Sequence, residues 1–466
     1  MGLTYLFISG IPKHFSGDDF LLLKASQSQG GYASSLTSCM TDIGMGKWRP
    51  AFVCAVSPAL DIFGDRYWCF FLLNLALVFL ICLVAGNVLK RIVQLPEWLV
   101  VLCVLVVPFS RFAWYGRISP FGLMEFGALL FALLFIRQFM AALDQQTISS
   151  WYLAGTFASL SALFHERYLV LLAAGFLVAI FNVRNKRTPV SFAPWLVFSG
   201  FLFVVKVLFL RTDPLVGGGE APLKASFNTW VLEHFFVGLK AVFGIGNGTN
   251  ISFDPTGYAR IPALGVLGEV WLVVLTMMLL LCALKTALQR GVLTFNNDSS
   301  KDSIERQTVL GQLLLMSGLL LIIPAATVIS RIEGRWLFGP EVFLFMFMIV
   351  AIRAQKSRVV FVSILLLFSV TCLEFLPDYE EPITLSNEVL EYVDGKLDGR
   401  NQLVYTIVDP RSRPELINWL DWVLGRAEKF EQIGVKSARY VDNRQCTGSC
   451  VKLVFEDTER FSFVGS

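Results

Sequence analysis

Apolar segments long enough to cross a lipid bilayer recur along this chain, and they restrict its fold more than any other feature. A membrane-crossing helix needs about 20 predominantly apolar residues. The segments are continuous rather than arranged in the stripes that are typical of soluble helices. Hydrophobic residues make up 55% of the 466 residues and charged residues only 16%, which leaves too little polar surface for a soluble protein of this length. The sequence therefore predicts a polytopic integral membrane protein, an all-α bundle.

About eleven transmembrane helices are predicted. The first apolar stretch, Leu3–Pro12, is too short to span a bilayer alone. It is either a half-buried anchor or the end of a first span, and the second interpretation is favoured. The other ten lie at about 67–88, 96–112, 120–138, 150–164, 168–183, 192–210, 264–286, 308–330, 336–353 and 358–375. The membrane domain is thus predicted over residues 1–376, with long outer loops at 13–66 and 211–263.

The orientation follows from where the cationic side chains lie. Lys and Arg gather in alternate short loops, and the positive-inside rule places such loops in the cytoplasm. This predicts a cytoplasmic N-terminus. It also predicts that the C-terminal tail and five loops lie on the outer, extracytoplasmic side of the membrane: 13–66, 111–119, 165–167, 211–263 and 331–335. The loops with this excess contain Lys90–Arg91, Arg137, Arg184, Lys186, Arg187, Lys285, Arg290, Arg353, Lys356 and Arg358.

Two further elements are predicted outside the apolar spans. Trp230–Phe243 reads either as an interfacial helix lying on the membrane or as an ordinary packed loop helix. The tail, 377–466, combines strand-like runs at Leu403–Val408 and Val451–Phe455 with a helical pattern over Pro414–Phe430. It is predicted to be a small α/β domain outside the cytoplasm, where a Cys446–Cys450 disulfide would help to stabilise it. The cysteines in or beside apolar segments, Cys54 among them, are interpreted as small core residues.

Asp18 and Asp19 form an acidic pair in the first outer loop. Adjacent carboxylates at a membrane surface can take a proton from a hydroxyl group or hold a divalent cation. The alternative is a solvated acidic turn or an N-cap for a helix that begins at Phe20. The dipeptide alone favours this alternative.

Basic residues on the outer side are candidate phosphate ligands. Lys47 and Arg49 lie in a Gly-Lys-Trp-Arg-Pro segment, and Arg331 and Arg335 lie at the outer end of the ninth span. If that stretch is helical, Arg331 and Arg335 share one face. Guanidinium groups beside an apolar groove suit a lipid-linked phosphate. The alternatives are headgroup anchoring, or an ion pair of Glu333 with one Arg.

The turn between the fifth and sixth spans contains His165, Glu166 and Arg167. Ionisable groups in so tight a turn are costly unless they are paired or functional. Mutual neutralisation of Glu166 and Arg167 and a functional role are equally compatible with the sequence. Arg117 lies in the outer loop 111–119, while Glu125 and Lys206 fall inside apolar segments and are predicted to face the bundle interior.

Together these motifs resemble the GT-C superfamily of membrane glycosyltransferases that use polyprenyl-phosphate sugars. The order is a first span, an outer acidic pair, a Lys-Trp-Arg-Pro segment, a His-Glu at the outer end of a middle span, and a late Arg-rich outer end. The nearest likeness is to bacterial O-antigen glucosyltransferases of the GtrII kind and to aminoarabinose transferases of lipid A. It covers roughly residues 1–375, and it places the chain in a bacterial inner membrane with a periplasmic C-terminal domain.

The resemblance implies roles for the candidate residues. Asp18, with Asp19 beside it, would be the catalytic base, and Arg331, Arg335, Arg49 and Lys47 would bind the donor phosphate. His165, Glu166 and Arg117 would orient a substrate. The implied partners are a polyprenyl-phosphate sugar donor, a glycan or lipid acceptor, and membrane lipid. Some members use a divalent cation, so Mg or Mn is open as a cofactor, although the sequence shows no metal-ligand motif. The segment between Asp19 and Arg49 departs from the pattern of Arg and aromatic residues expected after the acidic pair in close GtrII relatives, so the resemblance specifies neither the sugar nor the family branch.

Three other functions fit parts of the sequence. An O-antigen polymerase or ligase would use the outer Arg residues on a lipid-diphosphate donor. A transporter or flippase predicts inverted repeats and broken helices at the midplane, whereas here the notable charges lie at the outer rim. A non-catalytic scaffold would use the tail for binding. Nucleic acid is not an expected partner, because the net charge is only +3 and no basic face is concentrated.

Overall fold

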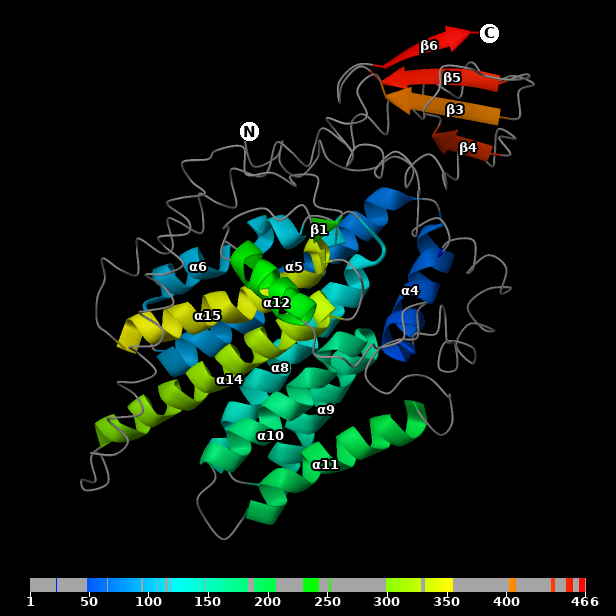
Figure 1. The fold of residues 1–466 in the computed structure, drawn as a ribbon. Coiled ribbons are helices and arrows are strands. Elements are labelled where there is room, and N and C mark those ends of the chain that lie inside the picture. The colour runs from blue at the N-terminus through cyan, green and yellow to red at the C-terminus, as the bar shows by residue number, and fades with distance from the viewer. Residues whose placement is uncertain are drawn as a thin grey trace.

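The computed structural model describes residues 22, 48–64, 66–93, 95–105, 107–113, 116–117, 119–145, 147–182, 188–206, 229–242, 251–252, 299–327, 332–354, 402–407, 437–440, 450–455 and 461–465. The described part of residues 48–354 is predominantly helical (Figure 1). Its α-helices are α4 (Pro50–Phe63), α5 (Tyr67–Val88), α6 (Glu97–Leu105), α8 (Gly122–Gln145), α9 (Ile148–Phe164), α10 (Val170–Asn182), α11 (Thr188–Val204), α12 (Thr229–Val242), α14 (Ser299–Thr327) and α15 (Phe338–Ala354).

Among the described residues, three helical segments are long and apolar enough to cross a membrane: Tyr67–Arg91, Gly122–Gln145 and Arg306–Pro324. Shorter apolar helices lie at Pro50–Phe63, Ile148–Phe164, Phe192–Val204 and Phe338–Ala351. These helices support the interpretation of a helical membrane protein. The predicted spans at 264–286 and 358–375, and the stretch Leu3–Pro12, lie outside the described residues.

The structure differs from the sequence prediction where prolines and polar turns intervene. The span predicted at 96–112 is wrong as one helix: α6 ends at Leu105, and short 3-10 turns follow at η3 (Val107–Phe109) and η4 (Arg111–Ala113). Pro108 explains the break, because proline offers no backbone N–H to an α-helix. The outer loop 13–66 is also not all loop, since α4 occupies its last part, with Pro50 at the helix start.

Helix α8 lies at the centre of the described bundle, where it packs against α5, α9, α14 and α15. Small residues let its backbone approach α9: Ala128 is fully buried, and its carbonyl accepts a hydrogen bond from Ser161 Oγ at 2.7 Å. Farther along, aromatic rings fill the space between α8, α9 and α11 in edge-to-face and tilted pairs, an arrangement that stabilises aromatic clusters. These rings belong to Phe135, Phe139, Trp151 and Trp195.

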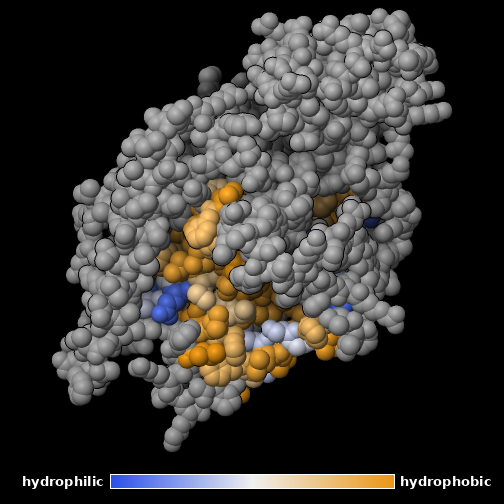
Figure 2. Space-filling model, viewed as in Figure 1, coloured by the Kyte–Doolittle hydropathy of each residue, from blue (hydrophilic) through white to orange (hydrophobic). Residues whose placement is uncertain are grey.

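Large apolar side chains also cover the outside of the bundle. Trp68, Leu72, Phe79 and Leu83 on α5 are each more than half exposed. Helix α11 exposes Leu196, Phe201 and Phe203 in the same way, and Figure 2 shows the described residues of one face as largely hydrophobic. Water would oppose exposure of so much apolar surface, whereas hydrocarbon would not.

The two ends of the bundle differ in whether their ionisable side chains are exposed or buried. At the end where α8 finishes, Asp144 pairs with Arg306 of α14 at 3.2 Å, and both side chains are solvent-exposed. Exposed Lys90 and Glu97 also form an ion pair, between the π-helix η2 (Leu89–Val93) and α6. At the end where α8 begins, several ionisable side chains are instead buried, among them Glu125, His165 and Glu166, and the candidate site lies there.

Four strands of the tail form one sheet in the order β4-β3-β5-β6. The strands are β3 (Gln402–Ile407), β4 (Ser437–Tyr440), β5 (Cys450–Phe455) and β6 (Phe461–Gly465). Strand β3 runs parallel to β4 and β5, while β5 and β6 are antiparallel. The two predicted strands are thus present, whereas β4 and β6 were not predicted. The predicted helix Pro414–Phe430 and Cys446 lie outside the described residues.

Candidate functional site

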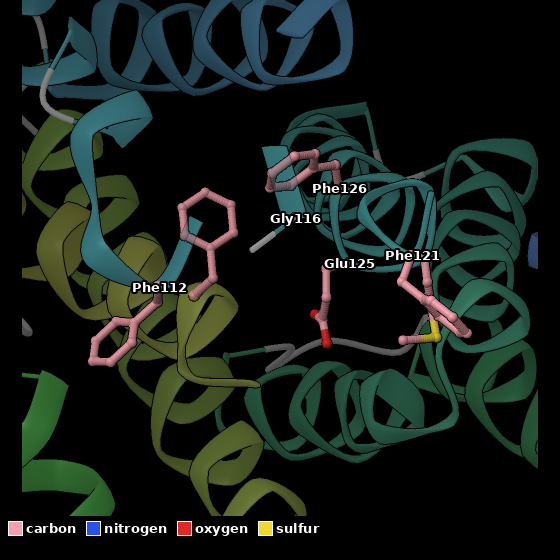
Figure 3. A pocket seen from close by; sticks show the side chains of 7 residues that line it. Phe112, Gly116, Phe121, Glu125 and Phe126 are labelled. Atoms are coloured by element: carbon pink, nitrogen blue, oxygen red, sulfur yellow. The ribbon is translucent and has the colours of Figure 1, made fainter. Parts of the chain in front are cut away.

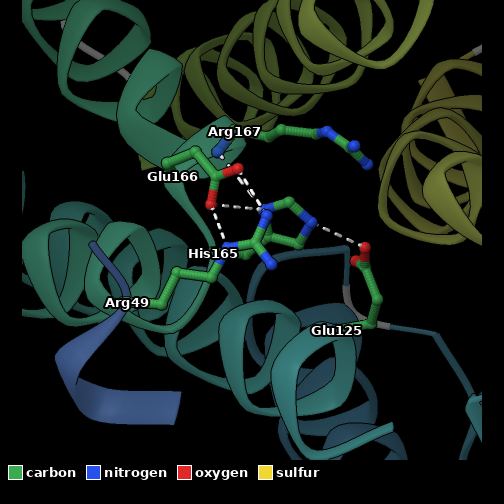
Figure 4. Close-up of polar contacts among 5 residues, drawn as sticks. All are labelled: Arg49, Glu125, His165, Glu166 and Arg167. Atoms are coloured by element: carbon green, nitrogen blue, oxygen red, sulfur yellow. Dashed lines mark hydrogen bonds and ion pairs between the residues drawn. The ribbon is translucent and has the colours of Figure 1, made fainter. Parts of the chain in front are cut away.

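Three segments far apart in the sequence bring ionisable side chains together at one end of the bundle. Arg49 precedes α4, Glu125 lies in the first turn of α8, and His165 and Glu166 lie in the turn between α9 and α10 (Figure 4). His165 is fully buried, and Glu125 and Glu166 are each 5% exposed. Burial of this many ionisable groups is expensive unless they compensate one another.

Arg49 and Glu166 form a bidentate ion pair. Arg49 Nη2 donates to Glu166 Oε1 at 2.5 Å, and Arg49 Nε donates to Oε2 of the same carboxylate. Burial alone raises the pKa of Glu166, but the charges of Arg49 and His165 and their hydrogen bonds hold that pKa well below its ordinary value. The pair therefore ties the start of α4 to the α9–α10 turn with both groups ionised.

His165 lies between two carboxylates. Its Nε2 is 3.1 Å from Glu125 Oε1, and its Nδ1 is 3.3 Å from Glu166 Oε2. The backbone N–H of Arg167 donates to Nδ1 at 3.4 Å. A neutral ring that accepts at Nδ1 carries its proton on Nε2, the nitrogen nearer to Glu125. The contact between Nε2 and Glu125 is electrostatic proximity and not a hydrogen bond.

The same turn reaches the segment before α15. The Arg167 guanidinium lies over the Trp336 ring, with Cζ 3.5 Å from the ring centre, which is a cation–π contact. Trp336 belongs to the 3-10 turn η7 (Gly334–Leu337), directly after β2 (Ile332–Glu333). Strand β2 pairs with β1 (Ile251–Ser252) in parallel. The segments predicted as outer loops 165–167, 211–263 and 331–335 therefore meet.

Buried hydrogen bonds fix the neighbouring segment 110–122. Asn74 of α5 donates to the carbonyl of Ser119 at 2.8 Å and to that of Arg117 at 3.3 Å. Ser110 Oγ donates to Glu341 of α15, and both residues are buried. The two bonds from Asn74 satisfy carbonyl groups directly before α8, and the Ser110–Glu341 bond ties the segment to α15.

A small cavity lies next to Glu125. Its volume is about 10 Å³, which is room for about one water molecule. Phe112, Gly116, Phe121, Met124, Phe126 and Phe338 line it together with Glu125. Figure 3 shows the Glu125 carboxylate among these apolar side chains. Glu125 is thus the single charged residue among the described residues that line this cavity.

The structure brings together some of the residues predicted from sequence. Arg49, His165 and Glu166 are in contact, and Arg117 is buried in the adjoining segment. Arg335 lies in η7, but the structure does not describe its side chain. Asp18, Asp19, Lys47 and Arg331 lie outside the described residues. The helical geometry under which Arg331 and Arg335 would share a face is not found in the described part of this stretch, where β2 and η7 form instead.

Several site features escaped the sequence prediction. Glu166 was considered as a partner of Arg167, but its ion pair is with Arg49, 117 positions earlier in the chain. Glu125 and Lys206 are buried as predicted, yet contact of Glu125 with His165 follows only from the packing of α8 on α9. The signal for Glu125 was its charge within an apolar segment. Cys54 is disulfide-bonded, which corrects its interpretation as a simple core residue.

Among the described residues, no group of three or more His, Cys, Asp and Glu side chains could hold a metal ion. The chain matches no family model, no curated protein and no solved structure. The likeness to the GT-C superfamily therefore stays a prediction from short motifs.

Proposed function

We propose that this protein is an inverting membrane glycosyltransferase. It moves a sugar from a polyprenyl-phosphate donor to a cell-envelope glycan or lipid acceptor on the outer face of a bacterial inner membrane. The observation that carries the proposal is the meeting of Arg49, His165 and Glu166, from two predicted outer loops, at one end of an apolar bundle. A lipid-borne substrate requires such an arrangement, with polar groups at the rim and apolar surface for the lipid tail.

The predicted topology agrees with the contacts among the outer segments. The Arg49–Glu166 ion pair joins the predicted outer loop 13–66 to the loop 165–167, and the Arg167–Trp336 contact joins loop 165–167 to the residue that follows loop 331–335. The pairing of β1 with β2 joins loop 331–335 to loop 211–263. The Cys54 disulfide favours an oxidising compartment for the segment around α4. Both observations support an outer location for this end of the bundle.

Some of the candidate residues take part in the reaction, and others bind the donor phosphate or position a neighbouring segment. Asp18, with Asp19 beside it, takes the proton of the acceptor hydroxyl as this attacks the anomeric carbon, and the lipid phosphate leaves with inversion. Arg331, Arg335 and Lys47 neutralise the departing phosphate, and a divalent cation such as Mg or Mn can share this task. Arg49 is given a different role, because Glu166 already binds two of its nitrogens: it positions the segment that carries Lys47.

The experiment measures transfer from radiolabelled polyprenyl-phosphate sugars in membranes that contain the full chain. Asp18→Asn is compared with Asp144→Asn, a matched change in an exposed carboxylate at the opposite end of the bundle. We expect Asp18→Asn to reduce transfer at least 100-fold, in line with the usual contribution of a general base, whereas Asp144→Asn retains it. Protein content and thermal unfolding in detergent show that both variants fold.

The outcomes separate the candidate functions. Normal transfer by Asp18→Asn would remove Asp18 as the base. Sugar-chain extension that uses a lipid diphosphate, tolerates Asp18→Asn and requires Arg331 would favour a polymerase or ligase. Movement of the intact donor across the membrane without bond cleavage would favour a flippase.

A further inference from the structure

Arg137 is an exposed cation within the apolar helix α8. It was expected in a short loop, but α8 continues to Gln145, the last residue of the candidate membrane span Gly122–Gln145. Arg137 therefore lies about 12 Å before the end of this span, measured along the helix axis. An arginine inside an apolar span costs free energy unless an anion accompanies it.

No anion within the described part of the chain accompanies Arg137. Its side chain is exposed, and no described residue forms an ion pair or a hydrogen bond with it. Asp144 lies near it on the same helix, but the carboxylate of Asp144 pairs with Arg306 of α14 at 3.2 Å. The positive charge of Arg137 is therefore available to an anion from outside the described chain.

Arg137 belongs to a narrow stripe of α8 that the bundle leaves partly uncovered, whereas most other residues of the helix are buried. The residues of this α8 stripe are half-buried or exposed: Leu130, Leu134, Arg137, Ala141 and Asp144. Their separations alternate between four and three residues, which puts them on one face of the helix. The stripe thus presents leucines at the middle of the span and a guanidinium group nearer to its end. A phospholipid has the matching order, an acyl chain followed by a phosphate.

The charge of the stripe favours an anionic phospholipid over a zwitterionic one. A zwitterionic headgroup brings its own ammonium group to its phosphate, whereas phosphatidylglycerol carries a net negative charge that Arg137 can neutralise. The stripe extends towards the end of α8 that lies opposite to Glu125, which is in the first turn. The positive-inside rule makes this the cytoplasmic side, where the surface of the membrane is rich in anionic lipid.

We propose that the α8 stripe binds an anionic phospholipid from the leaflet opposite to the candidate site. Arg137 binds the lipid phosphate, and Leu130 and Leu134 contact an acyl chain. This site is independent of the proposed glycosyltransferase function, because neither Arg137 nor the two leucines take part in the transfer.

Native mass spectrometry of the delipidated full chain in detergent measures how tightly each lipid binds. Phosphatidylglycerol, phosphatidylethanolamine and bare polyprenyl phosphate are titrated separately, and the wild type should bind phosphatidylglycerol most tightly. Arg137→Gln should weaken binding of phosphatidylglycerol about fivefold or more, the usual contribution of one basic residue to the attraction of anionic lipid. Arg137→Lys keeps the charge without the bidentate geometry and should retain part of the affinity.

Arg91→Gln is the matched control. Arg91 is exposed, and no described residue pairs with it. Helices α5 and α8 begin side by side, since Tyr67 and Leu123 share one apolar cluster, so Arg91 lies at the same end of the bundle as Arg137. Arg91→Gln removes a charge from this end but not from the stripe, and it should keep the wild-type affinity.

Three outcomes of the titration would overturn the proposal. Wild-type affinity in Arg137→Gln would show that Arg137 does not bind the lipid. An equal loss in Arg137→Gln and Arg91→Gln would show a diffuse attraction without a site. Binding of phosphatidylethanolamine or polyprenyl phosphate as tight as that of phosphatidylglycerol would show that the stripe does not select an anionic phospholipid.

Photo-crosslinking locates the bound lipid and does not depend on a variant that folds. Phosphatidylglycerol with a photoactivatable acyl chain is mixed into phosphatidylcholine vesicles that contain the full chain, and peptide mass spectrometry maps the adducts. In the wild type the adducts should concentrate around Leu130 and Leu134. In Arg137→Gln, once thermal unfolding shows that it folds, they should fall by the same factor as the affinity. Adducts spread evenly over the exposed faces of α5 and α11 would show contact with bulk lipid and refute the site.

Discussion

At the scale of single residues, the ion pair of Arg49 and Glu166 has the largest predicted effect on stability. Its two side chains are 12% and 5% exposed, so the loss of one leaves the other charge poorly solvated. Removal of one partner of a buried pair costs about 3–5 kcal/mol, whereas replacement of both by apolar residues is close to neutral. We expect Arg49→Met and Glu166→Leu each to lower the thermal unfolding midpoint in detergent, and the double variant to recover most of the loss. Two additive losses would contradict this coupling.

The same pair predicts how stability depends on pH. The pKa of Glu166 in the folded protein lies well below its ordinary value of 4.5, so folding favours the ionised form. Its contribution is complete above the unfolded pKa and disappears as the pH falls through the folded one. The difference in unfolding midpoint between wild type and Glu166→Gln should therefore be largest near neutral pH and shrink below about pH 4.5. A difference that stays constant from pH 7 down to pH 3 would exclude this mechanism.

The sequence identified charged residues but not their partners. His165 and Glu166 stood out because ionisable groups are rare in so short a turn between apolar segments. The partner of Glu166 could not be inferred, because Arg49 is 117 positions away and the contact depends on how α4 packs against α9. The pairing of Cys54 is likewise a property of the folded chain.

At the scale of elements, the first residue of α8, Gly122, is packed so closely that no side chain fits there. A Cβ on Gly122 would lie 1.8 Å from the Gly116 carbonyl oxygen and 2.7 Å from Asn74 Nδ2. Gly122→Ala must therefore move backbone, at a cost of about 3 kcal/mol or more. Gly200→Ala on α11 is the matched control, since no atom lies within 4 Å of its Cβ, and it should be neutral or stabilising. The measurement is thermal unfolding of both variants, and equal midpoints would argue against this packing.

Helix α4 is held by covalent and non-covalent links together. Phe52, Val56 and Leu60 bury its inner face, and Cys54 adds a disulfide. Loss of a native disulfide typically costs about 2–5 kcal/mol. Dithiothreitol should lower the unfolding midpoint of the wild type towards that of Cys54→Ser, and should change the variant much less. Equal responses of the two proteins would show that this disulfide does not stabilise the fold.

At the scale of the whole molecule, hydropathy predicted most of the described helices because each of those helices contains a long apolar run. It did best where a span is one regular helix, as in α5, and failed where the backbone turns sharply, as after Leu105. Helix α12 was predicted, and it packs against α14, where Gly238 lies close to Ile322. Strands β4 and β6 escaped prediction because short strands lack a strong pattern.

The orientation of the bundle can be tested on residues whose exposure is known. The positive-inside rule puts Lys90 and Asp144 on the cytoplasmic side, whereas Arg66, at the start of α5, belongs to the outer side. All three side chains are exposed, so cysteines placed there can react. In intact bacterial spheroplasts, a membrane-impermeant maleimide should label Arg66→Cys but neither Lys90→Cys nor Asp144→Cys, and permeabilised cells should show labelling of all three. Labelling of the unsubstituted chain gives the background from native thiols. The opposite pattern would place the Arg49–Glu166–His165–Glu125 cluster on the cytoplasmic side, where an outward-facing transferase could not use it.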